Sequence, residues 1–471
     1  MDEQLYQTIN RLRKSGELQE AWNVGCPAVQ ENPHDNFLKG AFFWVCYAHL
    51  KEIQSKIKSR AEHGTEFPVP AANELERINF YLDWIIWLDI ADGGFEYRSL
   101  LLIFQKNLGG MPKLLLLLVK HSGTLFNDED KKCFVTEHGE SPSLMLKFAR
   151  IVLKAWRENE EIRQLPIEQL CLLCERVRQE TNDKKNSIWL DYDEAKCFIA
   201  ANRFEQARDL VLGVLRKKSS ESWAWGALAA TYRKEDPDAA IVLFSKALCC
   251  AHDDVFALPV LRGFAQLLAD RGFPLEASMC VRRAANCYVE NGWKIKADLE
   301  TLMNASWYDD TADLTLLPAF LESHSASEQD FLYGKSEQRI GVVQNVHQSG
   351  KGFHAYLSKD QSISVRLGLY SLKSSPSPGD FVRLTLAAED QSVIGAEPCQ
   401  RERMDDVGDC EGDLRVAEKG FGFVEDTYVP KDLLRPEMDG RKVRVLRFLD
   451  FDKKKNRHSW KALKIEVLAS G

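Results

Sequence analysis

The spacing of apolar positions changes once along the chain, near residue 322. From residue 1 to about 320, apolar residues recur every three or four positions between short polar breaks, which predicts helices nearly throughout. Beyond this point, short runs such as IGVVQNV and DFVRLTLAA alternate apolar with polar residues. Such alternation is typical of strands, so we expect a helical region followed by β structure.

Two polar stretches mark the boundaries of the two sets of predicted strands. SHSASEQDFLYGKSEQ precedes the first set of strands, and RERMDDVGDCEGD separates it from a second set that includes KVRVLRFLDFD and WKALKIEVL. The predicted fold is a mainly α N-terminal helical-repeat solenoid followed by two small all-β barrels. The predicted domains are residues 1–165, 166–322, 337–399 and 411–471.

Internal similarity is clearest between about 188 and 290, where three helix-pair units follow one another. A small residue, Ala207, Ala240 or Ala277, opens the contact face of each second helix. Apolar partners follow at helical spacing: Val211, Val214, Phe244, Ala247, Val281 and Ala284. The pattern resembles the tetratricopeptide repeat, and that resemblance implies a protein partner on the concave surface of stacked helix pairs.

The N-terminal third shows weaker signs of the same repeat. SGELQEAWNVGCPAVQENP is a fainter copy, so residues 1–165 are interpreted as divergent and tetratricopeptide-like, ahead of the clearer repeats in 166–322. The aromatic-rich stretch INFYLDWIIWLDIADGGFEYRSLLLIF predicts a buried helix pair within the same solenoid.

The stretch AEKGFGFVEDTYV carries the most specific candidate chemistry. Side chains alternate along a strand, so Phe421 and Phe423 are expected on one face, with Tyr428 extending it from the next strand. Gly420 and Gly422 are expected to leave flat space where a base can lie against the rings. Stacking on aromatic rings contributes about 1–3 kcal/mol per base and tolerates any base sequence.

Basic residues accompany these rings and are expected to neutralise phosphates along the edge of the face. They are Lys419, Lys431, Lys453, Lys454, Lys455 and Arg457.

KGFGFV and TYVPKDLL resemble the two ribonucleoprotein motifs of the cold-shock domain. That resemblance implies an OB-fold barrel that binds single-stranded RNA or DNA. The match departs from the family in three places: GDLRVAEKG holds no aromatic residue, and Pro430 and Lys431 stand where the family has histidine and phenylalanine. A smaller stacking platform and weaker binding are therefore expected.

IGVVQNVHQSGKGFHAYLS in the first β module is similar to the same motif but more altered. Lys351 and Phe353 are retained, whereas His354 replaces the second glycine of the motif. With Tyr356 and Arg366, these residues are candidates for contact with a nucleic-acid strand. A purely structural barrel is the alternative.

Composition restricts these interpretations. The net charge of -8 leaves no global attraction for phosphate, so a nucleic-acid site has to be a local basic patch. No run approaches the ~20 apolar residues that span a bilayer, and MDEQLYQTINRLRKSG lacks the apolar core of a signal peptide. We therefore expect a cytoplasmic protein without membrane contact.

Twelve cysteines are present, most of them inside apolar helical patterns. Cys171 and Cys174 form the single CxxC, with no second pair or histidine pair nearby. A zinc site needs four convergent ligands, so reduced buried thiols are expected, with no metal and no cofactor.

No P-loop, GxSxG, HExxH or dinucleotide fingerprint occurs, so no catalytic residue is assigned and the protein is expected not to be an enzyme. The sequence predicts an adaptor that grips a protein partner through helices and nucleic acid through β modules. This architecture resembles proteins of bacterial TOTE-type conflict loci. The alternatives are a pure protein-interaction scaffold whose β modules no longer bind nucleic acid, and an enzyme with an unfamiliar site around residues 75–165.

Overall fold

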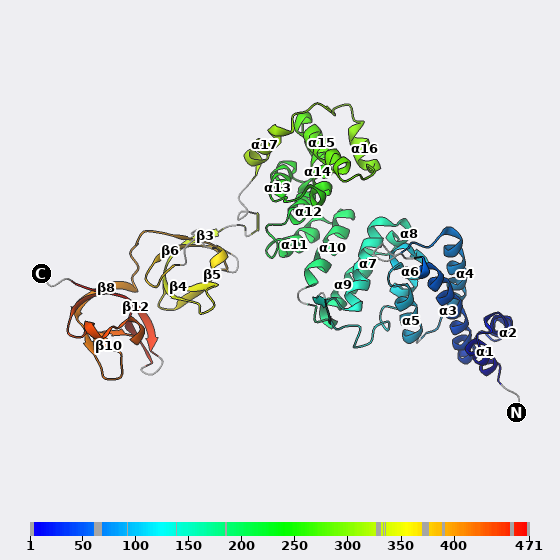
Figure 1. Cartoon of the computed structure of the whole chain (residues 1–471), viewed down its shortest axis with the longest axis horizontal. Helices are drawn as coiled ribbons and strands as arrows, with labels where there is room; N and C mark the ends of the chain where they lie inside the picture. The colour runs from blue at the N-terminus through cyan, green and yellow to red at the C-terminus, as the bar shows by residue number, and fades with distance from the viewer. Residues whose placement is uncertain are drawn as a thin grey trace. The chain divides into compact units, whose positions relative to one another are not determined.

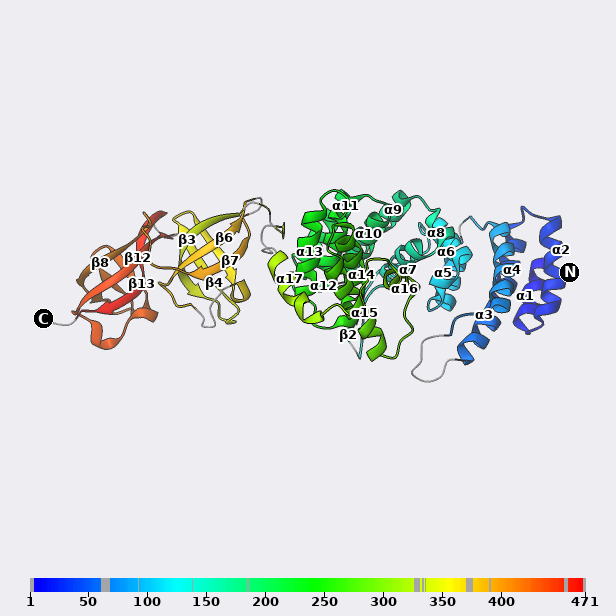
Figure 2. The same cartoon turned by 90° about the horizontal axis from the view of Figure 1, so that it is seen from above.

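The computed structural model divides the chain into two compact units, residues 1–325 and 326–471. The first unit is helical and the second consists of curled β-sheets, which confirms the predicted fold class (Figures 1 and 2). The predicted four-domain division stays a prediction. The structure describes the whole chain apart from residues 1–3, 61–67, 92, 138, 184–185, 326–330, 333, 335, 370–375, 389–390, 453–455 and 469–471, and apart from the side chain of residue 436.

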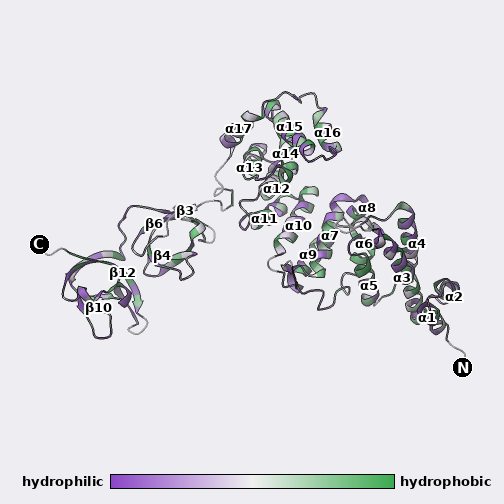
Figure 3. Cartoon of the chain, in the orientation of Figure 1, coloured by the Kyte–Doolittle hydropathy of each residue, from purple (hydrophilic) through white to green (hydrophobic). Residues whose placement is uncertain are grey.

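The first unit is built from α-helices of 4 to 24 residues, short 3-10 helices and a short hairpin. Its elements are α1 Leu5–Lys14, α2 Leu18–Glu31, α3 Asn36–Ser59, α4 Ala72–Leu88, α5 Gly94–Phe104, η1 Leu108–Gly110, α6 Pro112–Lys120, β1 Phe134–Thr136, β2 Gly139–Ser141, α7 Leu144–Glu158, α8 Glu160–Arg163, α9 Ile167–Glu180, α10 Ser187–Ala200, α11 Phe204–Leu215, α12 Ser222–Tyr232, α13 Pro237–Cys249, α14 Asp254–Asp270, α15 Pro274–Glu290, α16 Ala297–Met303, η2 Leu314–Leu316 and α17 Leu317–His324. Most helices carry both apolar and polar residues, as Figure 3 shows, and this lets them bury one face and solvate the other.

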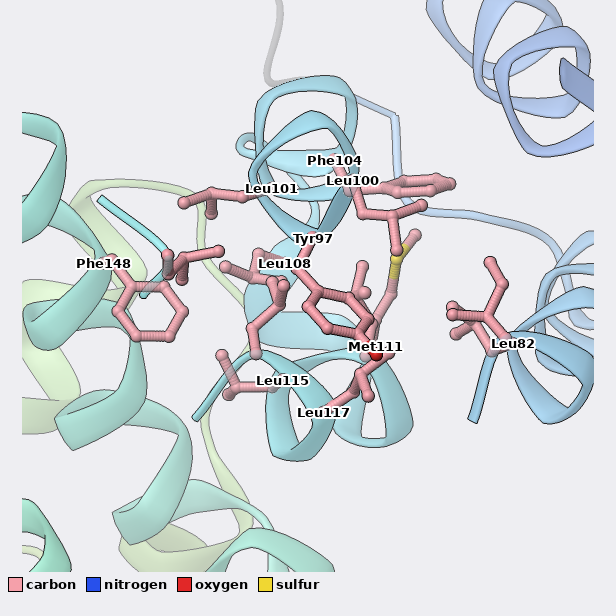
Figure 4. Close-up of a cluster of buried hydrophobic side chains, with 14 of the residues drawn as sticks. Leu82, Tyr97, Leu100, Leu101, Phe104, Leu108, Met111, Leu115, Leu117 and Phe148 are labelled. Carbon is pink, nitrogen blue, oxygen red and sulfur yellow. The ribbon is translucent and has the colours of Figure 1, made fainter. Parts of the chain in front are cut away.

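One apolar core runs through the first part of this unit, from Ile9 in α1 to Ala207 in α11. Figure 4 shows its centre, where Tyr97 and Phe104 of α5, Met111 before α6 and Phe148 of α7 lie together. Burying a large apolar side chain contributes about 1.5–3 kcal/mol relative to leaving it exposed.

The aromatic-rich stretch forms α4 and α5, but the expectation of a buried helix pair is only partly met. Both helices pack on α3, and α4 also packs on α6. Ile78, Leu82 and Ile85 are buried on one face of α4, whereas Phe80 on another face is 51% exposed. The helix is apolar over more than half of its circumference, but its neighbours cover only one side.

Three consecutive helix pairs, α10–α11, α12–α13 and α14–α15, correspond to the three repeated sequence units. Ala207, Ala240 and Ala277 are fully buried, as expected for small residues where helices approach closely. The six apolar partners expected beside them are also buried. Whether these pairs are tetratricopeptide repeats stays a prediction.

The cysteines are all free thiols. Cys46, Cys174, Cys197, Cys280 and Cys287 are buried, while Cys249, which lies in an apolar helical pattern, is exposed. Burial raises the pKa of the Cys174 thiol, which keeps it protonated and poorly reactive. Within the described residues, no group of three or more His, Cys, Asp or Glu side chains is placed to hold a metal ion. No helix in the described part of the chain is long and apolar enough to cross a membrane.

The second unit contains two antiparallel-rich sheets, which we call the first and second β modules. The first has the strand order β5-β4-β3-β6-β7, and the second β8-β12-β13-β11-β10-β9. The elements are β3 Ser336–Val346, β4 Gly352–Ser358, β5 Gln361–Arg366, η3 Leu367–Leu369, β6 Phe381–Ala387, β7 Val393–Pro398, β8 Val407–Asp413, β9 Arg415–Val416, β10 Gly422–Val424, β11 Thr427–Val429, η4 Lys431–Leu433, η5 Pro436–Met438, β12 Lys442–Asp452 and β13 Arg457–Val467.

The second β module closes on itself. β8 and β9 stand at opposite ends of the strand order, yet only Leu414 separates them in the chain. One segment therefore pairs with β12 on one side and with β10 on the other, and the sheet curls around the buried Leu414. The remaining core side chains include Val424, Val429 and Val443.

The two β modules share an apolar cluster. Val342, Tyr356 and Phe381 of the first module pack with three residues of the second, Val407, Phe448 and Leu463. The Tyr356 and Phe448 rings meet edge to face at 4.9 Å. The Tyr356 hydroxyl donates a hydrogen bond to the Leu449 carbonyl oxygen at 2.9 Å. Together these contacts join the modules into one unit.

Substitution of Gly226 tests whether α12 packs closely on α14. A β-carbon at this position would lie 2.6 Å from Cγ2 of Val260, so Gly226→Ala should lower the free energy of unfolding of the first unit by about 1–3 kcal/mol. Gly213→Ala is the matched control, because no atom lies within 4 Å of its β-carbon and alanine favours helix by about 0.5–1 kcal/mol. Urea unfolding followed by circular dichroism measures both. Equal effects of the two substitutions would contradict the tight contact.

Tyr356→Phe should loosen the contact between the β modules. Loss of the hydrogen bond to Leu449 should cost about 1 kcal/mol, which corresponds to roughly fivefold faster amide hydrogen exchange in β4 and β12. Tyr428→Phe, in the same unit but with a half-exposed ring, should leave exchange there unchanged. Unchanged exchange in Tyr356→Phe would show that the hydrogen bond does not contribute.

Candidate nucleic-acid interface

The aromatic residues of the second β module are positioned by a tight hairpin. β10 pairs with β11 so that Phe423 lies opposite Tyr428, and paired residues project from the same side of a sheet. The two-residue turn between them places Glu425 at φ 50°, a left-handed conformation that closes the hairpin. Phe421 lies just before β10, where its carbonyl oxygen accepts a hydrogen bond from the Ala417 amide at 2.7 Å.

The three rings form one cluster. The Phe421 and Phe423 centroids are 5.8 Å apart, and Tyr428 lies 5.6 Å from the first and 5.9 Å from the second. Phe423 is 38% exposed, and the other two rings are half-buried. The cluster therefore keeps an outer surface in contact with solvent although its rings support one another.

Gly422 does not leave flat space beside the rings, contrary to expectation. It alternates with Phe421 and Phe423 and therefore points inward, where a β-carbon would lie 3.0 Å from the Arg415 carbonyl oxygen and from Leu414 Cδ1. Gly420 has a positive φ of 79°, and the Lys431 side chain passes 3.4 Å from the place of its missing β-carbon. Its role is to form the turn and let Lys431 lie beside the cluster.

Strand pairing extends the aromatic face to both sides with cations. Arg415 of β9 lies opposite Phe423, and Lys461 of β13 lies opposite Tyr428. Arg415 is exposed, whereas the Lys461 ammonium lies 2.8 Å from a carboxylate oxygen of Asp450. Lys461 could not be found from the sequence motifs, because the register between β13 and β11 joins segments about thirty residues apart. Arg415 stands in GDLRVAEKG just before the motif, and its place opposite Phe423 depends on the pairing of β9 with β10. An alternating strand pattern around Lys461 was the available signal.

The pairing continues across all six strands, and we call this set the cross-strand row. Its members, in spatial order, are Val407, Phe448, Lys461, Tyr428, Phe423 and Arg415. The first two are buried under the first β module, and the last four face outward. One half of this face is therefore buried against the first β module, and the other half is accessible to solvent.

A groove of about 610 Å³ lies where the two halves meet. Phe448 and Lys461 of the row line it, opposite Asn345 of the first module. The other lining residues are Gln344, Val346, Pro378, Pro430, Asp432, Leu433, Ala462 and Leu463. The exposed half of the row therefore opens directly onto the boundary between the modules.

The predicted basic residues of the second module do not all lie at this face. Lys419 and Lys431 are exposed beside the aromatic cluster. Arg457 begins β13, four residues before Lys461, which places it about 13 Å along the strand from the row. Lys453 and Lys454, with Lys455, lie outside the described residues.

Arg447 compensates an acidic residue at the hairpin turn. Its guanidinium lies 4.2 Å from the centre of the Trp460 ring and donates to Asp426 at 2.6 Å and to Thr427 at 3.0 Å. The Asp426 charge near the aromatic cluster is therefore paired, which reduces its repulsion of phosphate.

The first β module presents a different surface. Phe353 is fully buried among Val343, Ala355 and Val365, so its predicted contact with nucleic acid is wrong: alternation along β4 turns this ring into the core. Tyr356 is likewise unavailable, because its ring is buried against Phe448.

The other predicted residues of the first module remain accessible. His354 is half-buried, with its ring 4.7 Å from that of His347. Lys351 and Arg366 are exposed at the start of β4 and the end of β5. The module thus offers cations and imidazoles, but its two motif aromatics are buried.

Two parts of the chain match known families. Residues 188–327 match a family described as a domain of unknown function, DUF7017. No curated protein matches the chain. Residues 409–465 match the family described as S1/CSD-like domain 2 of the TOTE conflict systems. This match confirms the cold-shock-like interpretation of the second module, while the tetratricopeptide repeats and an OB fold for the first module stay predictions. The chain therefore carries an S1/CSD-like domain similar to those of TOTE conflict systems.

Proposed function

We propose that the second β module binds single-stranded RNA or DNA through Phe421, Phe423 and Tyr428. The observation that carries this proposal is the exposed half of the cross-strand row, in which Phe423 and Tyr428 stand between Arg415 and Lys461. Aromatic faces between cations suit a flexible strand, because bases stack on the rings while phosphates lie near the charges. A duplex keeps its bases stacked on each other and has no such faces to offer.

The expected affinity is modest. Three rings in contact with each other, with one of them 38% exposed, offer room for about two bases, each contributing about 1–3 kcal/mol. Arg415, Lys419 and Lys431 add a salt-dependent contribution. Sequence preference should be weak, since stacking reads no base edge.

The wider proposal is a non-enzymatic adaptor in a conflict system, in which the helical unit holds a protein partner and the second β module holds nucleic acid. It is supported by the similarity to TOTE S1/CSD-like domains and by the exposed apolar residues on α4 and α5. The proposal assigns no catalytic step to the chain, and a cytoplasmic location remains a prediction. Turnover of nucleotides or nucleic acid by the purified chain would contradict it.

The second candidate is a scaffold whose β modules bind no nucleic acid. The packing of the three rings on one another favours it, because Phe423 meets both Phe421 and Tyr428 edge to face and these contacts stabilise the cluster without a ligand. The two candidates differ in the outcome of a single binding measurement.

Phe423→Ala should weaken binding of labelled oligo-dT or oligo-U to the full chain at least fivefold, and Phe421→Ala with Phe423→Ala at least about thirtyfold, because each ring contributes about 1–3 kcal/mol. Fluorescence anisotropy at low salt measures this. Phe451→Ala is the matched control, since Phe451 is an exposed phenylalanine of the same module outside the row. If the wild type shows no salt-dependent binding at about 10 μM, the scaffold candidate is favoured.

Arg415→Gln and Lys431→Gln should each reduce the slope of log affinity against log salt by about 0.7, the value per phosphate contact for single strands. Arg444→Gln serves as control, because Arg444 is paired with Glu411 at 2.6 Å away from the row. Slopes unchanged in both test variants would remove these cations from the interface.

A further inference from the structure

The groove between the two β modules combines an apolar lining with a few polar side chains. Most of its lining residues are apolar, and the polar ones are Gln344 and Asn345 of the first module and Asp432 and Lys461 of the second. A nucleobase has a matching composition, because its flat ring body is largely apolar and its edge carries hydrogen-bond donors and acceptors. The groove is therefore a candidate site for a base.

A β-bulge in β3 brings both amide side chains to the groove. Val343 pairs with Ala355 of β4, and the next paired residue of β3 is Asn345, opposite His354. Gln344 is the extra residue between these two pairs. In an uninterrupted pairing, Gln344 would stand opposite His354 and Asn345 would turn toward the core. The bulge keeps Asn345 outside the core and exposed.

The two amides differ in their availability to a ligand. The Gln344 side-chain oxygen accepts a hydrogen bond from the Ser362 hydroxyl at 3.0 Å. Asn345 is exposed, and no group in the described part of the chain forms a hydrogen bond with its side-chain amide. Its oxygen is free to accept and its nitrogen to donate. Asn345 is thus the better placed of the two to pair with a base edge.

The charges at the groove favour a base over a phosphate. The Lys461 ammonium lies 2.8 Å from Asp450, so its positive charge is already compensated. Asp432 is exposed in η4, and its carboxylate repels phosphate but accepts hydrogen bonds from an amino group. An amide can turn over to suit either an amino or a carbonyl edge, whereas a carboxylate only accepts. Asp432 therefore favours amino edges.

The groove continues the aromatic face of the second module. Tyr428 is paired with Lys461, and Lys461 with Phe448, which lines the groove. Phe448 therefore lies two strands, about 10 Å, from Tyr428. A single strand stacked on Phe423 and Tyr428 has its neighbouring nucleotides within reach of the groove.

We propose that the groove between the β modules binds one base of the single strand and selects a base with an amino group next to a ring nitrogen, which is adenine or cytosine. The inference deepens the proposed nucleic-acid function and rests on it. Asn345 accepts from the amino group and donates to the ring nitrogen, while Asp432 accepts the second amino hydrogen. Thymine, uracil and hypoxanthine carry a carbonyl oxygen in place of the amino group, and the carboxylate repels that oxygen.

The size of the groove agrees with this role. Its volume of about 610 Å³ lies within the range for ligand sites, about 300–1,000 Å³. The aromatic cluster itself remains indifferent to base sequence, because stacking reads no base edge. The groove adds a preference at one nucleotide.

Two matched pairs of oligonucleotides test the proposal on the full chain. In oligo-dT of about ten nucleotides, a central thymine is replaced by adenine or hypoxanthine, or by cytosine or uracil. Each pair differs in an amino group against a carbonyl oxygen, so the ring that stacks is the same size. Fluorescence anisotropy at low salt should show at least about fivefold tighter binding of the amino base in at least one pair, because a bidentate base contact contributes about 1–3 kcal/mol.

Variants of the two reading residues should remove this selectivity. Asn345→Ala should bring the ratio of the two affinities to about one, and Asp432→Asn should reduce it at least about threefold, because an amide can face either edge. Both side chains are exposed, so folding should be retained. Gln338→Ala and Asp413→Asn are the matched controls, since these residues are exposed in β3 and β8 and do not line the groove.

Three outcomes overturn the proposal: a ratio near one in both pairs, tighter binding of the carbonyl bases, or a ratio unchanged in both Asn345→Ala and Asp432→Asn. Failure of the nucleic-acid proposal is distinguishable. If the wild type binds none of the oligonucleotides, both proposals fall, whereas binding of all of them with equal affinity removes only the selective groove. Phe423→Ala should weaken binding of both members of a pair by the same factor and leave their ratio unchanged.

Discussion

Strand register in the second β module is the constraint on which the candidate interface depends. β8 and β9 are one segment interrupted only by Leu414, and this segment pairs with β12 on one side and with β10 on the other. The sheet therefore curls, and the register of each strand is fixed by a neighbour on either side. That register brings Arg415, Phe423 and Tyr428 beside Lys461. A slip of one residue would turn these side chains into the core and expose Val424.

The same face of the sheet serves two purposes, and neighbouring structure decides which. Val407 and Phe448 are covered by the first module, where Tyr356 supplies a hydrogen bond as well as apolar contact. Beyond Lys461 nothing in the described residues covers the row, so Phe423 stays exposed. Apolar burial and ligand access are thus separated along one row of paired residues. The groove between the modules marks the boundary.

Much of the organisation could be predicted because hydrophobic spacing depends on local geometry. The change from helical to alternating spacing near residue 322 matches the division into a helical unit and a β unit. Helices that pack closely need small residues where they touch, and this explains why Ala207, Ala240 and Ala277 are buried as predicted. Predictions from a single motif residue were less successful. Phe353 lies in a KGF motif like that of the second module, yet its ring lies in the core of the first module. Gly422 was expected beside the rings, but it faces the interior, where it lets Leu414 and the Arg415 backbone approach closely.

By itself, the sequence determined the two structural classes, the repeated helix pairs and the strand that carries Phe421 and Phe423, because each of these depends on residues close together in the chain. Only the tertiary structure decided that Arg415 and Lys461 flank the aromatic face, that Tyr356 belongs to an interface, and that Asn345 and Asp432 line one groove. These features join segments distant in sequence. Their positions depend on register and on how the β modules pack, which a local pattern of apolar and polar residues does not specify.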